Sequence, residues 1–356
     1  MVAVVDPSHE VIMPFLTLTL LATLPLGQAL DRCVAPPPSA SESVPVEFAD
    51  GRFFASWAPH GAAKLRFYLD TGGPRDQLFS ATVLRLGLAR QVEAVDGDSV
   101  SWVRLPAPLA TQLVPGLRSN TWMEPPHTDD GSVRLMASFP GGQLEQMASE
   151  GPGGAQVDGI LGPDWFGGRV WLLDYAAGSI GYRESGEIDS LPAKCWVPLG
   201  FQTSKAGERT SNFPRIVAEV DGDSVDFLVD TGAMTTLTDH ALAVVAPGGH
   251  RTIATSFIVR SRFDRWQSRH PDWPVVSEAD ENYHNRMIRV PAIVVGGQRL
   301  GPVWFSERPD RAFHEFMSQW MDRRIDGALG GSAWQQAVLV LDYPNAQAAV
   351  LEHGGK

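Results

Sequence analysis

The tripeptide Asp-Thr-Gly occurs twice in this chain of 356 residues, with its carboxylates at Asp70 and Asp230. Two carboxyl groups held close together cannot both ionise at low cost, so they share one proton. The ionised carboxylate can then accept a proton from a water molecule, while the protonated carboxyl polarises a carbonyl group. The two copies therefore predict a site in which Asp70 and Asp230 together activate one water molecule.

Each copy follows a segment in which apolar and other residues alternate, residues 64–69 and 224–229. This alternation predicts a strand with one buried face. Another apolar run precedes each strand, at residues 53–58 and 216–220, and Asp221-Gly222 is a turn signal typical of hairpins. Each Asp-Thr-Gly is therefore expected at the end of a hairpin strand.

A short helix is expected after each copy. Ser80 is predicted to cap a helix that ends at Gly87. Thr238 is predicted to cap a second helix that ends at Pro247-Gly248. The two halves thus continue in the same order after the tripeptide.

A third correspondence lies farther along the chain, where residues 157–162 (Val-Asp-Gly-Ile-Leu-Gly) match residues 325–330 (Ile-Asp-Gly-Ala-Leu-Gly). The tripeptides are 230 − 70 = 160 residues apart, and the aspartates of these later segments are 326 − 158 = 168 apart. A period of this length is too long for a solenoid and indicates two similar lobes. The second half is expected to carry a few extra residues between the motifs.

This order of hairpin, Asp-Thr-Gly, helix and Asp-Gly-x-Leu-Gly resembles the aspartic peptidase superfamily, in which pepsin-like enzymes carry both lobes on one chain. The local sequence around Leu69-Asp70-Thr71-Gly72 is closer to bacterial retropepsin-like domains, so the chain is similar to two such domains in tandem over residues 46–356. The resemblance implies a mostly β, bilobal fold with two β-barrel-like lobes and an active-site cleft between them.

The resemblance also implies roles for individual residues. Asp70 and Asp230 match the catalytic pair. Thr71 and Thr231 match threonines that hydrogen-bond across the lobe interface. Gly72 and Gly232 match glycines that leave room for substrate, and Gly162 and Gly330 match glycines that leave room for the aspartate loops.

The chain departs from the family pattern at two places. Gly73 stands where members of the family carry Ser, Thr or Ala, whereas its counterpart Ala233 fits, and both are predicted to contact substrate. Arg75 could bias the pKa of the pair if it turns inward. The expected flap segment of the first lobe lacks a Tyr, and Trp102 is the candidate for substrate contact there.

Other chemistries have little support in the sequence. His314 lacks the second histidine of a zinc-binding His-Glu-x-x-His helix, there is no Gly-x-Ser-x-Gly elbow, and the glycine-rich residues 151–154 are not followed by the Lys-Ser or Lys-Thr of a phosphate loop. No metal or other cofactor is expected. Asp158 and Asp326 are predicted to be turn or supporting residues, and residues 260–285 are predicted to be an inserted surface loop.

Composition agrees with a β-rich enzyme. The 27 prolines and 35 glycines favour strands and turns, and 44% hydrophobic residues suffice for a large core. The 41 acidic and 29 basic side chains give a net charge of −12, which argues against a nucleic-acid partner.

The amino-terminal region indicates export. Residues 14–26 are apolar and of signal-peptide length, so residues 1–30 are predicted to be a signal peptide, with a retained membrane anchor as the alternative. Residues 31–45 are predicted to be a Pro/Ser-rich linker, followed by lobes at 46–190 and 196–356. Cys33 and Cys195 could form a disulfide in an oxidising compartment, and two free thiols are the alternative.

The sequence thus predicts an exported (periplasmic or secreted) aspartic endopeptidase, active as a monomer on peptide or protein substrates. The alternative is a catalytically inactive peptide-binding or scaffold protein that keeps the same fold.

Overall fold

The computed structural model describes residues 33–34, 43–57, 64–95, 98–105, 133–138, 143–183 and 191–353. The predicted signal peptide and most of the predicted linker lie outside these ranges. Everything below concerns the compact unit Cys33–Lys356.

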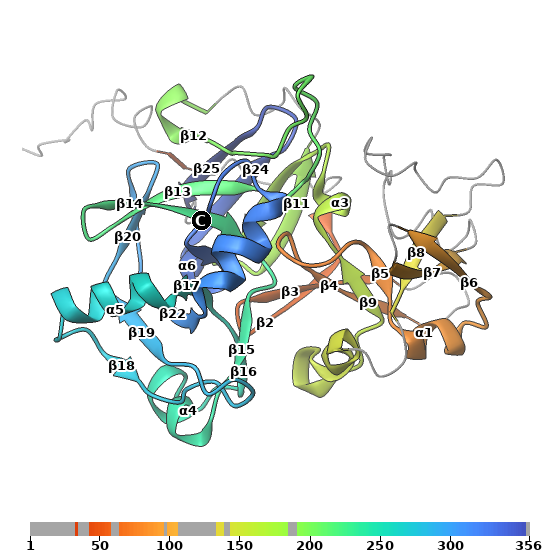
Figure 1. Cartoon of the computed structure of the whole chain (residues 1–356), viewed down its shortest axis with the longest axis horizontal. Helices are drawn as coiled ribbons and strands as arrows, with labels where there is room; N and C mark the ends of the chain where they lie inside the picture. Colours follow the sequence, from red (N-terminus) through yellow and green to blue (C-terminus); the bar gives the residue numbers. More distant parts are fainter. Residues whose placement is uncertain are drawn as a thin grey trace, which may run out of the picture. The chain divides into compact units, whose positions relative to one another are not determined.

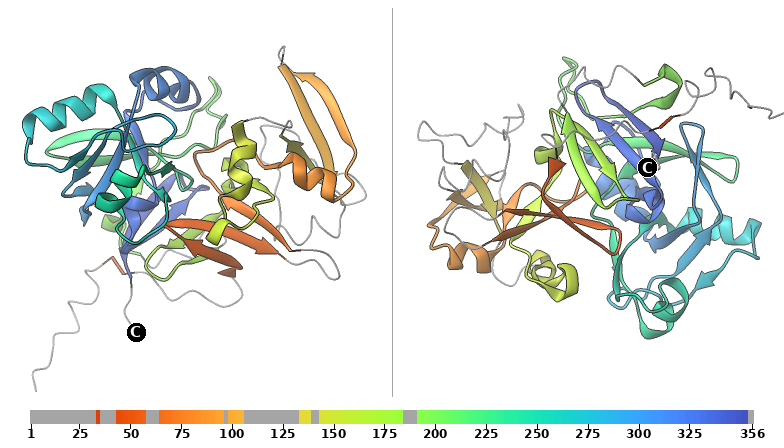
Figure 2. Two further views of the ribbon diagram at one scale, coloured as in Figure 1. Left: turned by 90° about the horizontal axis from the view of Figure 1, so that it is seen from below. Right: turned by 180° about the vertical axis from the view of Figure 1, so that it is seen from behind.

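The fold is mostly β, as predicted, and strands from the first half build one large sheet (Figure 1). This eight-stranded sheet defines the first lobe. In spatial order its strands are β2 (Val46–Ala49), β3 (Arg52–Trp57), β4 (Leu65–Leu69), β9 (Gly159–Leu161), β5 (Gln77–Leu78), β8 (Val133–Ala137), β7 (Asp98–Leu105) and β6 (Arg90–Val95). Strands β6 and β7 form a long hairpin that projects from the rest of this lobe (Figure 2).

Strands from the second half build a nine-stranded sheet, which defines the second lobe. In spatial order they are β18 (Val275–Val276), β19 (Met287–Val290), β22 (Val303–Arg308), β17 (Ser256–Val259), β23 (Gly327–Leu329), β14 (Asp223–Val229), β13 (Arg215–Val220), β20 (Ile293–Val295) and β21 (Gln298–Leu300). A separate pair, β15 (Met234–Thr236) and β16 (Thr252–Ala254), accompanies this sheet.

A six-stranded sheet contains strands from both halves and joins the lobes. Its order is β1 (Ser43–Val44), β11 (Ser179–Arg183), β10 (Val170–Asp174), β24 (Ala337–Asp342), β25 (Gln347–Glu352) and β12 (Trp196–Pro198). Strands β10 and β24 are antiparallel, with Leu172 opposite Val340. Since 340 − 172 = 168 is also the offset between Asp158 and Asp326, duplicated residues face each other here and an approximate two-fold axis passes between them. Ser43 and Val44 were expected in the linker but belong to this sheet.

The helices are short. They are α1 (Ser80–Arg85), α3 (Pro163–Phe166), α4 (Asp239–Val245), α5 (Arg260–Arg269) and α6 (Gly331–Trp334). Short 3₁₀ helices are η3 (Gln143–Ser149), η4 (Pro152–Gly154), η5 (Ala193–Cys195) and η7 (Met317–Trp320), and η6 (Ala312–Phe316) is a π-helical turn. Thr238 caps α4 as predicted, because its hydroxyl accepts from the Ala241 amide at 3.3 Å. The predicted cap at Ser80 is wrong: Phe79 precedes the helix, and Ser80 is its first residue.

The helices that follow the two tripeptides are not equivalent in space. In the first lobe, β5 runs antiparallel to β9 and parallel to β8. In the second lobe, β17 runs antiparallel to β23 and parallel to β22, so β17 is the counterpart of β5. Leu78 and Ile258 face Gly159 and Gly327, so the offset here is 258 − 78 = 180 rather than 160. The second lobe therefore carries 180 − 160 = 20 extra residues after its tripeptide, and they include β15, α4 and β16.

This assignment corrects the prediction for residues 260–285. Their first part is the helix α5, which follows β17 as α1 follows β5, so this part is the counterpart of α1 and not an inserted loop. The real insertion contacts the first lobe. The Ala254 amide donates to the Asp50 carbonyl at 2.8 Å, and the buried Arg52 donates to the Thr252 carbonyl at 3.2 Å.

The strands that precede the tripeptides are buried on both faces rather than on one. Phe67 and Leu69 lie in the main core with Phe227 and Val229, as the alternation predicts. Of the intervening side chains, Tyr68 and Leu228 are also buried, because further apolar clusters cover this end of β4 and β14 on the other face.

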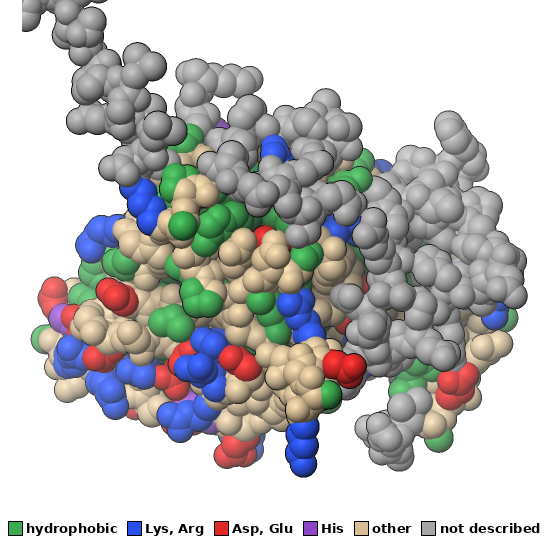
Figure 3. Space-filling model, turned by 90° about the horizontal axis from the view of Figure 1, so that it is seen from above, with side chains coloured by type: hydrophobic (Ala, Val, Ile, Leu, Met, Phe, Trp, Pro, Cys, Tyr) green, Lys and Arg blue, Asp and Glu red, His purple; other side chains and the backbone are tan. Residues whose placement is uncertain are grey.

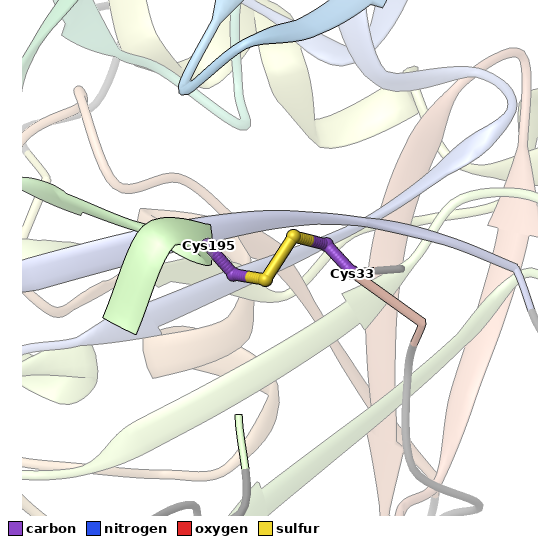
Figure 4. Close-up of a disulfide and its surroundings, with 2 residues drawn as sticks. All are labelled: Cys33 and Cys195. Carbon is purple, nitrogen blue, oxygen red and sulfur yellow. A yellow bond between two sulfur atoms is a disulfide. The ribbon is translucent and has the colours of Figure 1, made fainter. Parts of the chain in front are cut away.

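Cys33 and Cys195 form a disulfide between the start of the described chain and η5 (Figure 4). The Cys33 carbonyl also accepts from the Glu352 amide at 2.8 Å. Among the described helices, none is both long and apolar enough to cross a membrane.

Basic and acidic side chains are interspersed over the described part of the face in Figure 3. Many of them are paired. On α5, for example, Arg262 binds Asp326, and Arg269 binds both Asp221 and Asp223. The surface charge is therefore locally compensated despite the net charge of −12.

Candidate active site

Each Asp-Thr-Gly begins where a hairpin strand ends against a parallel neighbour. Leu69 on β4 pairs with Leu161 on β9, and Val229 on β14 pairs with Leu329 on β23. The next amides continue the pattern: Asp70 donates to the Leu161 carbonyl at 3.0 Å, and the Asp230 amide donates to the Leu329 carbonyl at 2.9 Å. The backbone of both aspartates is thus fixed by sheet hydrogen bonds on either side of the two-fold axis.

The two threonines bond reciprocally across the lobes. The Thr71 amide donates to the Thr231 hydroxyl, and the Thr231 amide donates to the Thr71 hydroxyl, each at 3.0 Å. The hydroxyls in turn donate to the carbonyls of Val229 and Leu69, at 2.7 and 2.9 Å. Both threonines are fully buried, so these four bonds join the loops in a region without water.

The carboxyl groups of Asp70 and Asp230 each lie against the glycine of the opposite loop, and each influences the pKa of the other. Each also accepts its own loop amide, from Gly72 or Gly232, at 3.1 Å. Burial raises the pKa of Asp70, while the neighbouring Asp230 and the loop amides oppose this rise. Burial and the neighbouring charge of Asp70 raise the pKa of Asp230 well above its ordinary value. Two buried carboxyl groups coupled in this way hold one proton between them.

Four glycines permit close approaches. A Cβ atom at Gly72 would lie 2.5 Å from the Asp230 Cγ, and one at Gly232 would lie 2.1 Å from the Asp70 Cγ. A Cβ at Gly162 or Gly330 would lie 1.9 Å from a carbonyl oxygen, that of Pro74 or Thr255. Any side chain at these positions would displace the loops.

Gly73 has a steric explanation. A Cβ atom there would lie 2.1 Å from Asp70 Oδ2, whereas Ala233 is accommodated at the equivalent place in the second loop. Residue 73 is therefore Gly because the Asp70 carboxylate occupies the space that a side chain would need.

Tyr68 is part of the site and was not identified from the sequence. Its hydroxyl donates to the Gly232 carbonyl at 2.9 Å, although Tyr68 lies on β4 and Gly232 on the opposite loop. The equivalent residue of the second lobe is Leu228 (68 + 160), so the contact is one-sided. The sequence contained one signal for this role: Tyr68 carries a hydroxyl, whereas the duplicated residue Leu228 is aliphatic.

Asp158 and Asp326 directly precede β9 and β23, the strands that pair with the strands leading to the two tripeptides. Asp158 accepts from the Thr82 hydroxyl at 3.0 Å and pairs with Arg85 of α1. Asp326 pairs with Arg262 of α5 and bonds His314 at 2.9 Å. Asp158 therefore connects β9 to α1, and Asp326 connects β23 to α5.

Trp102 and Arg75 lie in different surroundings. Trp102 is in the middle of β7, opposite Gln91 and Met136, and is 6% exposed, so the structure gives no support for substrate contact by its side chain. Arg75 lies on the first loop, where its charge partly opposes the rise that burial causes in the pKa of Asp76.

A cavity of about 940 Å³ opens beside the first loop. Gly72, Gly73 and Pro74 form one side. The second lobe supplies the opposite side, including Phe316 and Trp320, which are 63% and 38% exposed. Within the described residues, no group of three or more His, Cys, Asp or Glu side chains is arranged to hold a metal ion.

No protein-family model matches this chain, and no curated protein sequence matches it. Similar solved structures include the aspartic proteinase from Irpex lacteus, with 12% identity and a TM-score of 0.42 over 88% of this chain and 97% of that chain. They also include conglutin gamma, a basic 7S globulin from lupine seeds (11% identity, TM-score 0.41, 87% of this chain and 94% of that one), and basic 7S globulin from soybean (10%, 0.41, 87% and 94%). These similarities are too low to carry an argument about activity, and they include both a proteinase and globulins.

Proposed function

We propose that this protein is an aspartic-type endopeptidase that adds water to a peptide bond between Asp70 and Asp230. The observation that carries the proposal is the convergence of these two carboxyl groups, one from each lobe, each lying against the glycine of the opposite loop. The reciprocal bonds of Thr71 and Thr231 support it, because they hold the two loops in the geometry that a shared proton requires.

The reaction uses only these two side chains and water. Asp230 donates its proton to the carbonyl oxygen of the scissile bond, and Asp70 accepts a proton from the water molecule as its oxygen bonds to the carbonyl carbon. The resulting gem-diol returns one hydroxyl proton to Asp230 as the carbon–nitrogen bond breaks. Asp70 gives its proton to the nitrogen in the same step, so the product leaves as a neutral amine and the enzyme ends in its starting state.

A peptide in extended conformation suits such a site, since backbone groups supply affinity and side-chain pockets supply selectivity. The cavity beside Gly72 and Gly73 is the natural place for a side chain next to the scissile bond. Its mostly apolar lining, with Phe316 and Trp320 on the second lobe, favours a large apolar residue.

Export to the periplasm or the exterior is part of the proposal. Disulfides such as that between Cys33 and Cys195 persist in oxidising compartments. Fractionation of cells that express the full chain, followed by electrophoresis with and without reductant, tests this. Recovery of the reduced chain in the cytoplasm alone would contradict it.

The activity is tested with an unfolded protein substrate at a pH of about 3 to 6. Wild type should cut it and be inhibited by a pepstatin-type compound, whereas Asp70→Asn and Asp230→Asn should not cut. Asp239→Asn, at a highly exposed carboxylate on α4, is the control and should retain activity. If wild type and both site variants bind peptide equally and none cuts, the protein is a peptide-binding relative of this fold.

A further inference from the structure

The two lobes anchor their Asp-Gly-x-Leu-Gly segments with different chemistry. In the second lobe, the Gly330 amide donates to the Ser256 hydroxyl at 3.1 Å. In the first lobe, the Gly162 amide donates to Asp76 Oδ1 at 2.7 Å. Asp76 directly precedes β5, and Ser256 is the first residue of β17, so the two residues occupy equivalent places in the two sheets. A carboxyl group in the first lobe therefore replaces a hydroxyl in the second.

A second residue shows the same replacement. The Ser256 hydroxyl bonds the Ser332 hydroxyl at 3.0 Å, and Ser332 is the second residue of α6. Its counterpart is Asp164 (332 − 168), the second residue of α3. A pair of hydroxyls in one lobe thus corresponds to a pair of carboxyl groups in the other.

Uncharged groups donate hydrogen bonds to both carboxyl groups. Asp76 is 9% exposed and accepts from the amides of Gly162 and Trp165. Asp164 accepts from the Asn212 side chain of the second lobe at 3.3 Å and borders the cavity.

Three charged or titratable groups lie near the pair. Arg75 lies on the same loop as Asp76, Tyr343 follows β24, and Arg209 donates to the Tyr343 carbonyl at 2.6 Å. Burial and the charge of Asp164 raise the pKa of Asp76 well above its ordinary value, and the charge of Arg75 opposes this only partly.

We propose that Asp76 and Asp164 are positioning residues that share one proton, and that this proton holds the first Asp-Thr-Gly loop against α3. When the proton is present, one carboxyl group is neutral and Asp76 can remain buried. When it is lost, two like charges repel each other in a site of low dielectric constant. The Pro74 carbonyl touches Gly162, so movement of Asp76 is passed to the loop that carries Gly73 and Asp70.

The shared proton is tested by thermal unfolding of the full chain over a range of pH, which does not depend on the proposed function. Asp164→Asn should unfold at nearly the same temperature as wild type in acid, since an amide replaces a protonated carboxyl. As pH rises, wild type acquires a second buried charge and the variant does not. The variant should therefore become the more stable protein, by about 2 °C or more.

Ser332→Ala is the matched control, since it alters the equivalent hydroxyl pair. Its difference from wild type should not depend on pH. The Asp70–Asp230 pair titrates in all three proteins and cancels in the differences. A difference for Asp164→Asn that is constant with pH, or that has the opposite sign, would overturn the proposal.

The positioning role has a kinetic readout, and this part rests on the proposed function. Asp76→Ala removes the acceptor for the Gly162 amide, so kcat should fall about ten- to hundredfold with little change in KM. Asp76→Ser restores the hydroxyl that the second lobe uses and should recover most of kcat. Equal losses in the two variants would reject the positioning role, whereas a wild type without activity would reject the proposed function and leave the unfolding test intact.

Discussion

The Thr71 and Thr231 hydroxyls each accept the backbone amide of the other residue and donate to a carbonyl one residue before the opposite aspartate. Each hydroxyl thus serves as donor and acceptor, and both are fully buried. The two halves of the candidate site are therefore fixed to each other by the residue that directly follows each aspartate.

Replacing Thr71 with Val should remove this connection without changing the side-chain shape. The Thr231 amide and the Val229 carbonyl would lose their partners in a buried region, which costs about 1 to 3 kcal/mol for each group. Urea unfolding should show the loss, and peptidase activity should fall with it. Thr71→Ser keeps the hydroxyl and is expected to remain close to wild type; equal stability of the Val and Ser variants would contradict this.

Gly73→Ala should reduce kcat much more than it reduces stability. The added Cβ would lie 2.1 Å from Asp70 Oδ2, so the carboxylate must move from its partner Asp230. Misplacement of a reacting group by about 1 Å costs on the order of a hundredfold in rate. The matched control is Ala233→Gly, which introduces no clash and should keep most of the activity. A normal kcat in Gly73→Ala would contradict this, because it would show that the loop accommodates the methyl group without displacing the Asp70 carboxylate.

The carboxyl pair should make the protein more stable in acid than at neutral pH. The folded-state pKa of Asp230 is raised, so its contribution is fully present below its unfolded pKa and is lost as pH rises through the folded value. Asp230→Asn cannot ionise and should lose less stability over the same rise in pH. Calorimetric unfolding of both proteins measures this, and parallel pH profiles would contradict it. Activity should decline over the same rise, because the reaction requires a protonated Asp230.

Tyr68→Phe should destabilise the site by about 1 kcal/mol or more, because the buried Gly232 carbonyl loses its donor. A useful comparison is Tyr343→Phe. Among the described residues, the buried Tyr343 hydroxyl has no hydrogen-bond partner, so its removal should be neutral or stabilising. Chemical unfolding of both variants tests the difference. If the two substitutions have the same effect, the bond to Gly232 contributes nothing.

Trp320→Ala should lower kcat/KM for peptides with a large apolar residue next to the scissile bond, mainly through KM. The partly exposed indole borders the cavity beside Gly72 and Gly73, and its loss removes apolar surface for the substrate. Peptides with a small residue at that place should be affected little. Val244→Ala, at an exposed apolar residue on α4, controls for general surface effects. Equal losses for both classes of peptide would remove Trp320 from specificity.

Several features of the fold could be predicted because they depend on neighbours in sequence. The alternation before Asp70 and Asp230 encodes strands, and Asp221-Gly222, with positive φ angles of 53° and 80°, forms the expected hairpin turn. The repeated Asp-Gly-x-Leu-Gly segments indicated two lobes, and the mostly β bilobal fold is confirmed. The insertion was misplaced, because only sheet pairing shows that β17 and not β15 is the counterpart of β5.

By itself, the sequence determined the strands, their turns and the twofold repetition, since strand alternation and turn preference act over a few residues. Only the tertiary structure decided that Tyr68 bonds Gly232, that Gly73 cannot carry a side chain, and that Asp76 accepts from the Gly162 amide. These relationships join residues from different strands, loops and lobes. Their energies depend on burial and on distances between atoms, which no local pattern in the chain specifies.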